Sequence, residues 1–121
     1  MTSLPSRQWQ ELTTRDVAAL AARDPVVVLP LAAIEQHGPH LPLSTDLEIA
    51  LGLIDEASTR VGSDVTLSVL PPIAVGTSPE HQQFPGTLSL APELLIDTIC
   101  HLGAAVAATG VRRLVLFNAH G

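Results

Sequence analysis

The sequence predicts an α/β fold in which helices form layers on both faces of a mainly parallel β-sheet. Short apolar runs typical of strands alternate along the chain with segments of helical periodicity. The run from Val26 to Leu31 is almost continuously apolar, as expected of a parallel strand that is covered on both faces. A chain of 121 residues can bury one modest core, so we expect a single domain over residues 1–121.

Helices and strands are expected to alternate, beginning with a helix. In chain order the expected elements are helix 15–22, strand 26–33, helix 46–60, strand 65–70, helix 91–109 and strand 113–117. Thr13 and Thr14 can cap the first helix, and Asp24–Pro25 ends it, because the residue before a proline avoids the α region. The apolar run that follows is the first strand.

The second helix follows a loop rich in Gly, Pro and His. Thr45 and Glu48 have the spacing of a capping box, which puts Asp46 in the first helical turn. Gly62 is expected to close this helix. The apolar stripe at helical spacing, which we expect to be buried, consists of Ile49, Ala50, Leu53, Ile54 and Ala57.

The rest of the chain continues the alternation. Pro71–Pro72 stops the second strand, and the segment 73–88 is too polar and too rich in Gly and Pro for regular structure. Loops of this length in compact domains are usually functional or disordered. Pro92 lies in the first turn of the third helix, and Gly110 is its expected C-cap. The apolar residues at helical spacing on this helix are Leu95, Ile99, Leu102 and Val106.

Composition and charge exclude several function classes. The formal net charge is −6, the basic residues form no cluster and aromatic residues make up 2%, which argues against nucleic-acid binding. No apolar run approaches the ~18 residues of a membrane helix, so no membrane partner is expected. The single cysteine, Cys100, excludes a disulfide framework and is expected to be a small core residue. The lack of a disulfide framework and an N-terminus unlike a signal peptide together predict a cytoplasmic location.

The residues best suited to bind metal are Glu35, His37, Asp46 and His120. Imidazole and carboxylate groups are the ligands of zinc, manganese and iron sites. Two of these residues follow the first strand, one begins the next helix and one follows the last strand, so a parallel sheet brings all four to one edge. Asp46, on a rigid helical turn, suits a carboxylate that bridges two ions. Equally, the loop residues among them can be ordinary solvated side chains.

Other polar residues have more than one interpretation each. His40 can be a metal ligand or a residue that orients one, and Glu80–His81 can be a proton-transfer pair, a substrate contact or an exposed loop tip. Asn118 can bind a ligand or fix the loop that carries His120. Neither a Gly-rich phosphate loop nor a GxSxG elbow is present, which disfavours a flavodoxin-like binding module and a serine hydrolase.

Three segments resemble the creatininase (creatinine amidohydrolase) family. The first is EQHGPHLPL at 35–43 followed by Thr45–Asp46. The second is PIAVG at 72–76 with Glu80–His81 and FPGT at 84–87, and the third is NAHG at 118–121. The likeness extends from about Val26 to the end of the chain, and EQHGPHLP followed by TD is a specific signature. The SPEH loop also resembles the branch that contains the peptidase of mycofactocin maturation.

The resemblance implies a creatininase-like, layered α/β/α amidohydrolase with two divalent ions, zinc paired with zinc or manganese, in a homo-oligomer that is commonly a hexamer. Carried over residue by residue, Glu35, His37, Asp46 and His120 match the family's metal ligands, with Asp46 as the bridging ligand. The family member that opens creatinine has a Glu two residues after the histidine that matches His120. That position would be 122. Because the sequence stops on the loop after a strand, where a helix should follow, we expect residues 1–121 to be the N-terminal half of a larger protein.

The function expected from these features is hydrolysis of a cyclic or linear C–N amide bond by metal-activated water, in a small-molecule amide or a peptide. Glu80 and His81 are the catalytic candidates within the chain, His81 as a proton shuttle, while His40 and Asn118 would contact the substrate or support the ligands. The alternative is a non-catalytic truncated fragment or pseudo-subunit that keeps part of the metal site.

Overall fold

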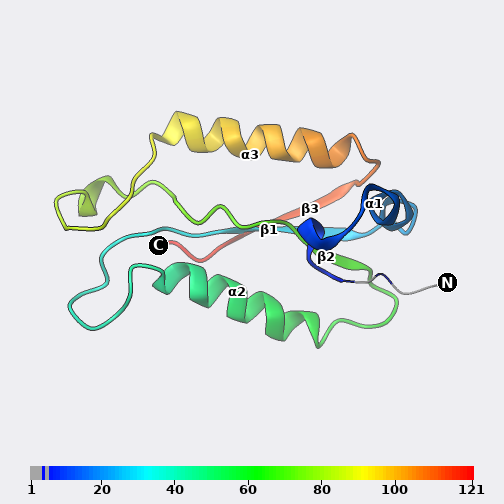
Figure 1. Cartoon of the computed structure of the whole chain (residues 1–121), viewed down its shortest axis with the longest axis horizontal. Coiled ribbons are helices and arrows are strands. Elements are labelled where there is room, and N and C mark those ends of the chain that lie inside the picture. Colours follow the sequence, from blue (N-terminus) through cyan, green and yellow to red (C-terminus); the bar gives the residue numbers. More distant parts are fainter. Residues whose placement is uncertain (1–3, 5) are drawn as a thin grey trace.

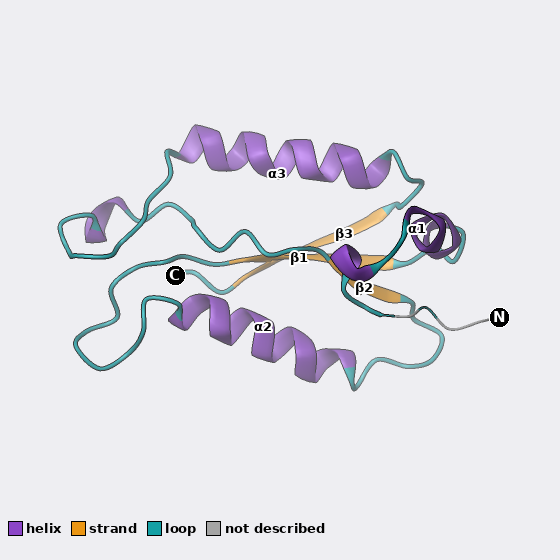
Figure 2. Ribbon diagram, in the orientation of Figure 1, coloured by secondary structure: helices purple, strands orange, loops and turns teal. Residues whose placement is uncertain are grey.

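The computed structural model describes residue 4 and residues 6–121 as a three-stranded parallel sheet with helices on both faces (Figures 1 and 2). The strands are β1 (Val26–Leu31), β2 (Leu67–Val69) and β3 (Arg113–Asn118), in the spatial order β2-β1-β3. The helices are α1 (Thr14–Ala21), α2 (Thr45–Ser58) and α3 (Pro92–Ala107), with short 3₁₀ turns η1 (Trp9–Glu11) and η2 (Pro79–His81). This confirms the predicted α/β class with a parallel sheet.

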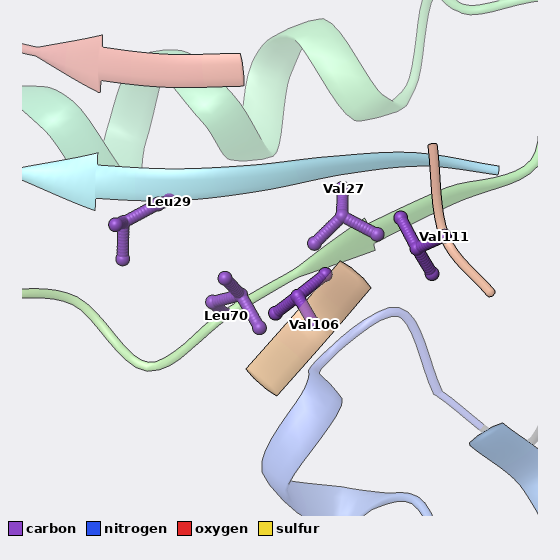
Figure 3. Packing of buried hydrophobic residues seen from close by; sticks show 5 residues of the cluster. All are labelled: Val27, Leu29, Leu70, Val106 and Val111. Carbon is purple, nitrogen blue, oxygen red and sulfur yellow. The ribbon is translucent and has the colours of Figure 1, made fainter. Parts of the chain in front are cut away.

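The core lies on both faces of β1, because successive side chains of a strand point to opposite sides. On one face, Val27 and Leu29 pack against residues from beyond β2 and from α3, among them Leu70 and Val106 (Figure 3). Trp9 of η1 and Ala21 of α1 pack against the same cluster. On the other face Val28 packs with Val69 and with Ile54 of α2. The two faces therefore hold α2 on one side of the sheet and α1 and α3 on the other.

Element boundaries differ from the predicted ones by one or two residues, at helix ends and strand ends alike. The second strand is three residues long, Leu67–Val69, because the preceding Val65 turns back to hydrogen-bond the carbonyl of Gly62. β1 ends at Leu31, where its register with β3 also ends, and Ala32 instead donates to the carbonyl of Ile73. The expected loop at 73–88 contains η2, so it is not wholly irregular.

Helix capping was predicted correctly for α1 only. Thr13 accepts a hydrogen bond from the backbone of Asp16, whose carboxylate accepts one from the backbone of Thr13, which completes a capping box. The predicted capping box of α2 is wrong: Ser44 is the N-cap, and the Thr45 hydroxyl donates to the Pro42 carbonyl at 2.6 Å. The C-caps are also residues other than the expected glycines. Thr59 is the C-cap of α2 and Ala108 is the C-cap of α3, and Gly110 takes up a left-handed φ of 100° two residues after Ala108.

The buried side of α2 is a different row from the predicted stripe. Ala50 and Ile54 are buried as expected, but Ile49 and Leu53 are 48% and 53% exposed. The buried row, spaced by four residues, is Asp46, Ala50, Ile54 and Ser58. The helix is thus turned so that the row containing Asp46 faces the sheet, and a carboxylate takes a place that the pattern assigned to aliphatic side chains.

The predicted apolar stripe of α3 is only partly buried. Val106 is buried and Ile99 is half-buried against the core, whereas Leu102 is 38% exposed. Cys100 is exposed, so its expected place in the core is wrong. Within residue 4 and residues 6–121, none of the helices combines the length and the apolar character needed to cross a bilayer.

Candidate metal centre

Three polar residues from distant parts of the sequence meet at the carboxyl edge of the sheet. Glu35 lies four residues after β1, Asp46 is the second residue of α2, and His120 lies two residues after β3. β1 and β3 end together, with Leu31 paired to Asn118, so the loops that follow them leave the sheet side by side. One ligand atom from each of the three residues lies within 4.8 Å of the others.

Asp46 sits between two imidazole rings. Its Oδ1 lies 3.0 Å from His37 Nε2 and its Oδ2 lies 3.2 Å from His120 Nδ1. His120 Nδ1 is also 3.2 Å from Oε1 of Glu35. The carboxylate of Asp46 therefore spans the gap between the two histidines, each of which faces a different oxygen.

Backbone carbonyls fix the orientation of both rings. His37 Nδ1 lies 3.0 Å from the carbonyl oxygen of Glu35, and His120 Nε2 lies 2.9 Å from that of Thr77. A carbonyl only accepts hydrogen bonds, so each of these nitrogens carries a proton and donates it. The other nitrogen of each ring is then directed at carboxylate oxygen, an arrangement that requires either a second proton or a cation between them.

The same contacts raise the pKa of both histidines above the ordinary value of 6.5. For His37 the main cause is the hydrogen bond to the Glu35 carbonyl, and the negative charge of Asp46 adds to it while burial opposes it. For His120 burial acts against the charged form, but the Thr77 carbonyl and the charges of Glu35 and Asp46 outweigh it and raise the pKa. The pocket is therefore one that attracts positive charge.

The donor set fits a divalent cation. Glu35 and Asp46 are each only 6% exposed, and burying a carboxylate is costly unless positive charge compensates it. Oε2 of Glu35 is buried and has no hydrogen-bond partner among the residues that the structure describes. Two buried carboxylates with imidazoles held from behind by backbone carbonyls are the arrangement found around protein-bound zinc and similar metals.

The loop that carries His120 is held by Asn118. Its side-chain Nδ2 donates to the His120 carbonyl at 3.1 Å, and its Oδ1 accepts from the His120 amide at 3.0 Å. These two hydrogen bonds are those expected if Asn118 fixes the loop, and its contact with a ligand stays a prediction. His40 is exposed, and it belongs to neither of the groups of possible ligand residues found in the described part of the chain.

Glu80 and His81 lie in η2, beside the cluster rather than within it. His81 Nε2 is 3.9 Å from Oε2 of Glu35 and 3.9 Å from Oε1 of Glu80. The side chain of Glu80 is 57% exposed and that of His81 is 29% exposed. These two residues, with Glu35, make the second group of possible ligands.

Sequence reasoning missed the residues that support His120 from behind. Thr77 supplies the carbonyl that orients the ring, and the hydroxyl of the fully buried Ser78 lies 3.5 Å from the same nitrogen. Gly76 lets this segment approach the chain just after β1, because a Cβ there would lie 2.6 Å from the carbonyl oxygen of Ala32. Gly76 and Thr77 stand directly before the SPEH motif in the sequence, but the role of Thr77 belongs to its backbone carbonyl, which no side-chain pattern reveals.

Comparison with known proteins gives a consistent result. The family model described as creatinine amidohydrolase matches residues 10–121. The mycofactocin precursor peptide peptidase of Mycobacterium tuberculosis is 39% identical over 117 residues, which are 92% of this chain and 46% of that protein. The creatinine amidohydrolase of Pseudomonas putida is 34% identical over 117 residues, which are 93% of this chain and 42% of that protein.

Solved structures give the same result. A creatininase described as the manganese form superimposes with a TM-score of 0.85 at 34% identity, over 95% of this chain and 46% of that one. A creatininase variant described as the Zn–Zn type gives a TM-score of 0.84 at 34% identity, over 95% and 45%. The chain spans less than half the length of these relatives. Its sequence and fold together show that the chain belongs to the creatininase family.

Proposed function

We propose that this chain holds divalent metal ions and contributes to the hydrolysis of a C–N amide bond. The observation that carries the proposal is the placement of Asp46, whose two oxygens face two different imidazoles, 3.0 Å and 3.2 Å away. A carboxylate in that position suits a bridge between two ions. Glu35, Asp46 and His120 would hold one ion, and His37 with Asp46 would hold part of the other.

The chemistry that such ions supply when bound is the lowering of the pKa of water and the polarisation of a carbonyl oxygen. The residues of this chain orient the site. The carbonyls of Glu35 and Thr77 fix the rings of His37 and His120, and Asn118 holds the loop behind His120. Zinc, paired with zinc or manganese, is the proposed content, supported by the forms in which related creatininases have been solved.

Glu80 and His81 are the residues that we assign to the substrate side. They lie at the partly exposed margin of the cluster, next to the buried Glu35. A small-molecule amide or a peptide is the proposed substrate class, since the relatives include a creatinine amidohydrolase and a precursor peptide peptidase. A homo-oligomer, a hexamer by family resemblance, is part of the same proposal.

Elemental analysis of purified protein tests the metal assignment. Asp46→Ala is expected to lose both ions, because each ion would depend on one oxygen of this carboxylate. Asp55→Ala, which changes an exposed residue of the same helix, is the matched control and is expected to keep its metal. Full metal content in Asp46→Ala would rule out the bridging role.

Hydrolysis of creatinine and of a set of short peptides by the metal-loaded protein tests the activity. Metal binding without any turnover would favour the alternative, a non-catalytic subunit that keeps part of the metal site. The fact that the chain spans less than half of its relatives makes that alternative worth testing.

A further inference from the structure

The side chain of Gln36 is fixed in one orientation by the backbone. Its Oε1 accepts a hydrogen bond from the amide of Gly38 at 2.9 Å. A backbone N–H can only donate, so the oxygen of the Gln36 amide must be the atom on that side. The backbone of Gln36 is itself held, since its N–H donates to the hydroxyl of Thr87 at 3.1 Å.

The fixed amide determines the tautomer of His81. With Oε1 committed to Gly38, the Nε2 group of Gln36 points at His81 Nδ1, 3.0 Å away, and donates to it. Nδ1 must then be the nitrogen with the free electron pair, so the neutral ring carries its proton on Nε2. That nitrogen lies 3.9 Å from Oε2 of Glu35 and 3.9 Å from Oε1 of Glu80, too far for a direct hydrogen bond to either.

We infer that Gln36 is a positioning residue that holds His81 as an Nε2–H hydrogen-bond donor directed into the space beside Glu35 and Glu80. This deepens the proposed function, on which it rests, by assigning His81 to contact with an electron-rich substrate atom such as an amide carbonyl oxygen. The ring is 29% exposed, so a ligand can reach it.

The direction of the hydrogen bond between Gln36 and His81 also decides whether His81 can serve as a metal ligand or as a hydrogen-bond donor. Glu35, Glu80 and His81 are spaced like metal ligands. A metal ligand needs a nitrogen with a free electron pair, and here the pair of Nδ1 is used by Gln36 while Nε2 carries the proton. His81 therefore faces the site as a donor and not as a third metal-binding histidine.

Long-range ¹H–¹⁵N NMR of the histidine rings of metal-free protein tests the inference directly, because it reports which ring nitrogen is protonated. For the wild-type protein we expect His81 to be protonated on Nε2 and not on Nδ1. A proton on Nδ1 of wild-type His81 would overturn the inference without the use of any variant.

Gln36→Glu tests the role of Gln36, because the new carboxylate can still accept from Gly38 but must also accept from His81. We expect the variant to place a proton on Nδ1 of His81 and to leave the signals of His101, on the outside of α3, unchanged. Gln82→Glu, at an exposed neighbour of His81, is the matched control and should leave the His81 pattern as in the wild type. An unchanged His81 pattern in Gln36→Glu would show that Gln36 does not set the tautomer.

Addition of Zn²⁺ to the wild-type protein separates this inference from the proposed function. We expect the ring signals of His37 and His120 to shift while His81 stays protonated on Nε2. Loss of the Nε2 proton of His81 would make it a metal ligand and overturn the inference. If no zinc binds, the proposed function fails, but the tautomer of His81 is still read from the same spectra.

Discussion

Along β1 the molecule buries aliphatic side chains, whereas just past the end of that strand it buries carboxylates. Val27 and Leu29 are fully buried, and Glu35 and Asp46 are almost as well covered, each only 6% exposed. Burial of the first pair stabilises the fold by itself, at about 1.5–3 kcal/mol for each side chain. Burial of the second pair costs free energy unless positive charge is supplied. The hydrophobic core is therefore stable without added charge, whereas the buried carboxylates of the site need compensating positive charge.

The largest effect is expected from a change in the core. Leu29→Ala should lower the free energy of unfolding by about 2–5 kcal/mol, since it leaves a cavity in a closely packed cluster. Urea denaturation with and without Zn²⁺ measures this, and the loss should be the same in both, because no metal ligand is touched. Leu53→Ala, at a position that is 53% exposed on α2, is the control, with an expected change within about 0.5 kcal/mol.

At the metal site, in contrast, the effect of a substitution on the free energy of unfolding should depend on Zn²⁺. Zn²⁺ at a free concentration about 100 times its Kd should raise the free energy of unfolding of the wild-type protein by about 2.7 kcal/mol. Glu35→Gln should lose most of that gain, because the amide is a poorer ligand than the carboxylate. Glu11→Gln, at an exposed residue of η1, should keep it. Equal zinc stabilisation of Glu35→Gln and the wild type would mean that the ion binds elsewhere.

A pair of glycine substitutions compares the segment that supports His120 with an ordinary position in a helix. Gly76→Ala should destabilise the protein by more than about 1 kcal/mol, because the new Cβ would lie 2.6 Å from the Ala32 carbonyl oxygen and would displace Thr77 from His120. Gly52→Ala, in α2 with nothing within 4 Å of the new Cβ, should stabilise by up to about 1 kcal/mol. Thermal unfolding measures both. A neutral Gly76→Ala would mean that the segment can move away from β1 without loss.

The smallest effect is expected from pH alone. The pKa values of His37 and His120 are raised above 6.5 in the folded, metal-free protein. Their contribution to stability is therefore fully present below pH 6.5 and is lost as the pH rises through the raised values. Zinc affinity should change in the other direction and increase with pH, because the metal displaces those protons. Denaturation curves of metal-free protein at several pH values check the sign, and stability that rose between pH 6 and pH 8 would contradict it.

Much of the fold could be predicted because it depends on local patterns. The apolar run of β1, the helical periodicity and the turn residues gave the alternating order and the parallel sheet. The rotation of α2 could not be predicted in this way: Ile49 and Leu53 match the apolar period as well as Ala50 and Ile54 do. Only the tertiary structure shows that the row with Asp46 faces the sheet.

The candidate site was predictable to the extent that it depends on strand ends. Glu35, Asp46 and His120 are drawn together by the topology of a parallel sheet, and the sequence motif marks the same residues. The backbone carbonyl of Thr77 and the orientation of Gln36 leave no mark in the side-chain pattern, because their roles depend on which atom of a group faces the histidine. The metal roles of the predicted ligands, the single-domain organisation of residues 1–121 and the oligomer stay predictions.

Anomalous X-ray diffraction from zinc-soaked crystals is the most direct test for cations bound at the carboxyl edge of the sheet. We predict an anomalous peak within coordination distance of Glu35, Asp46 and His120, and a second peak on the other side of Asp46, near His37. The absence of a peak at Asp46, or peaks only at surface carboxylates, would contradict it.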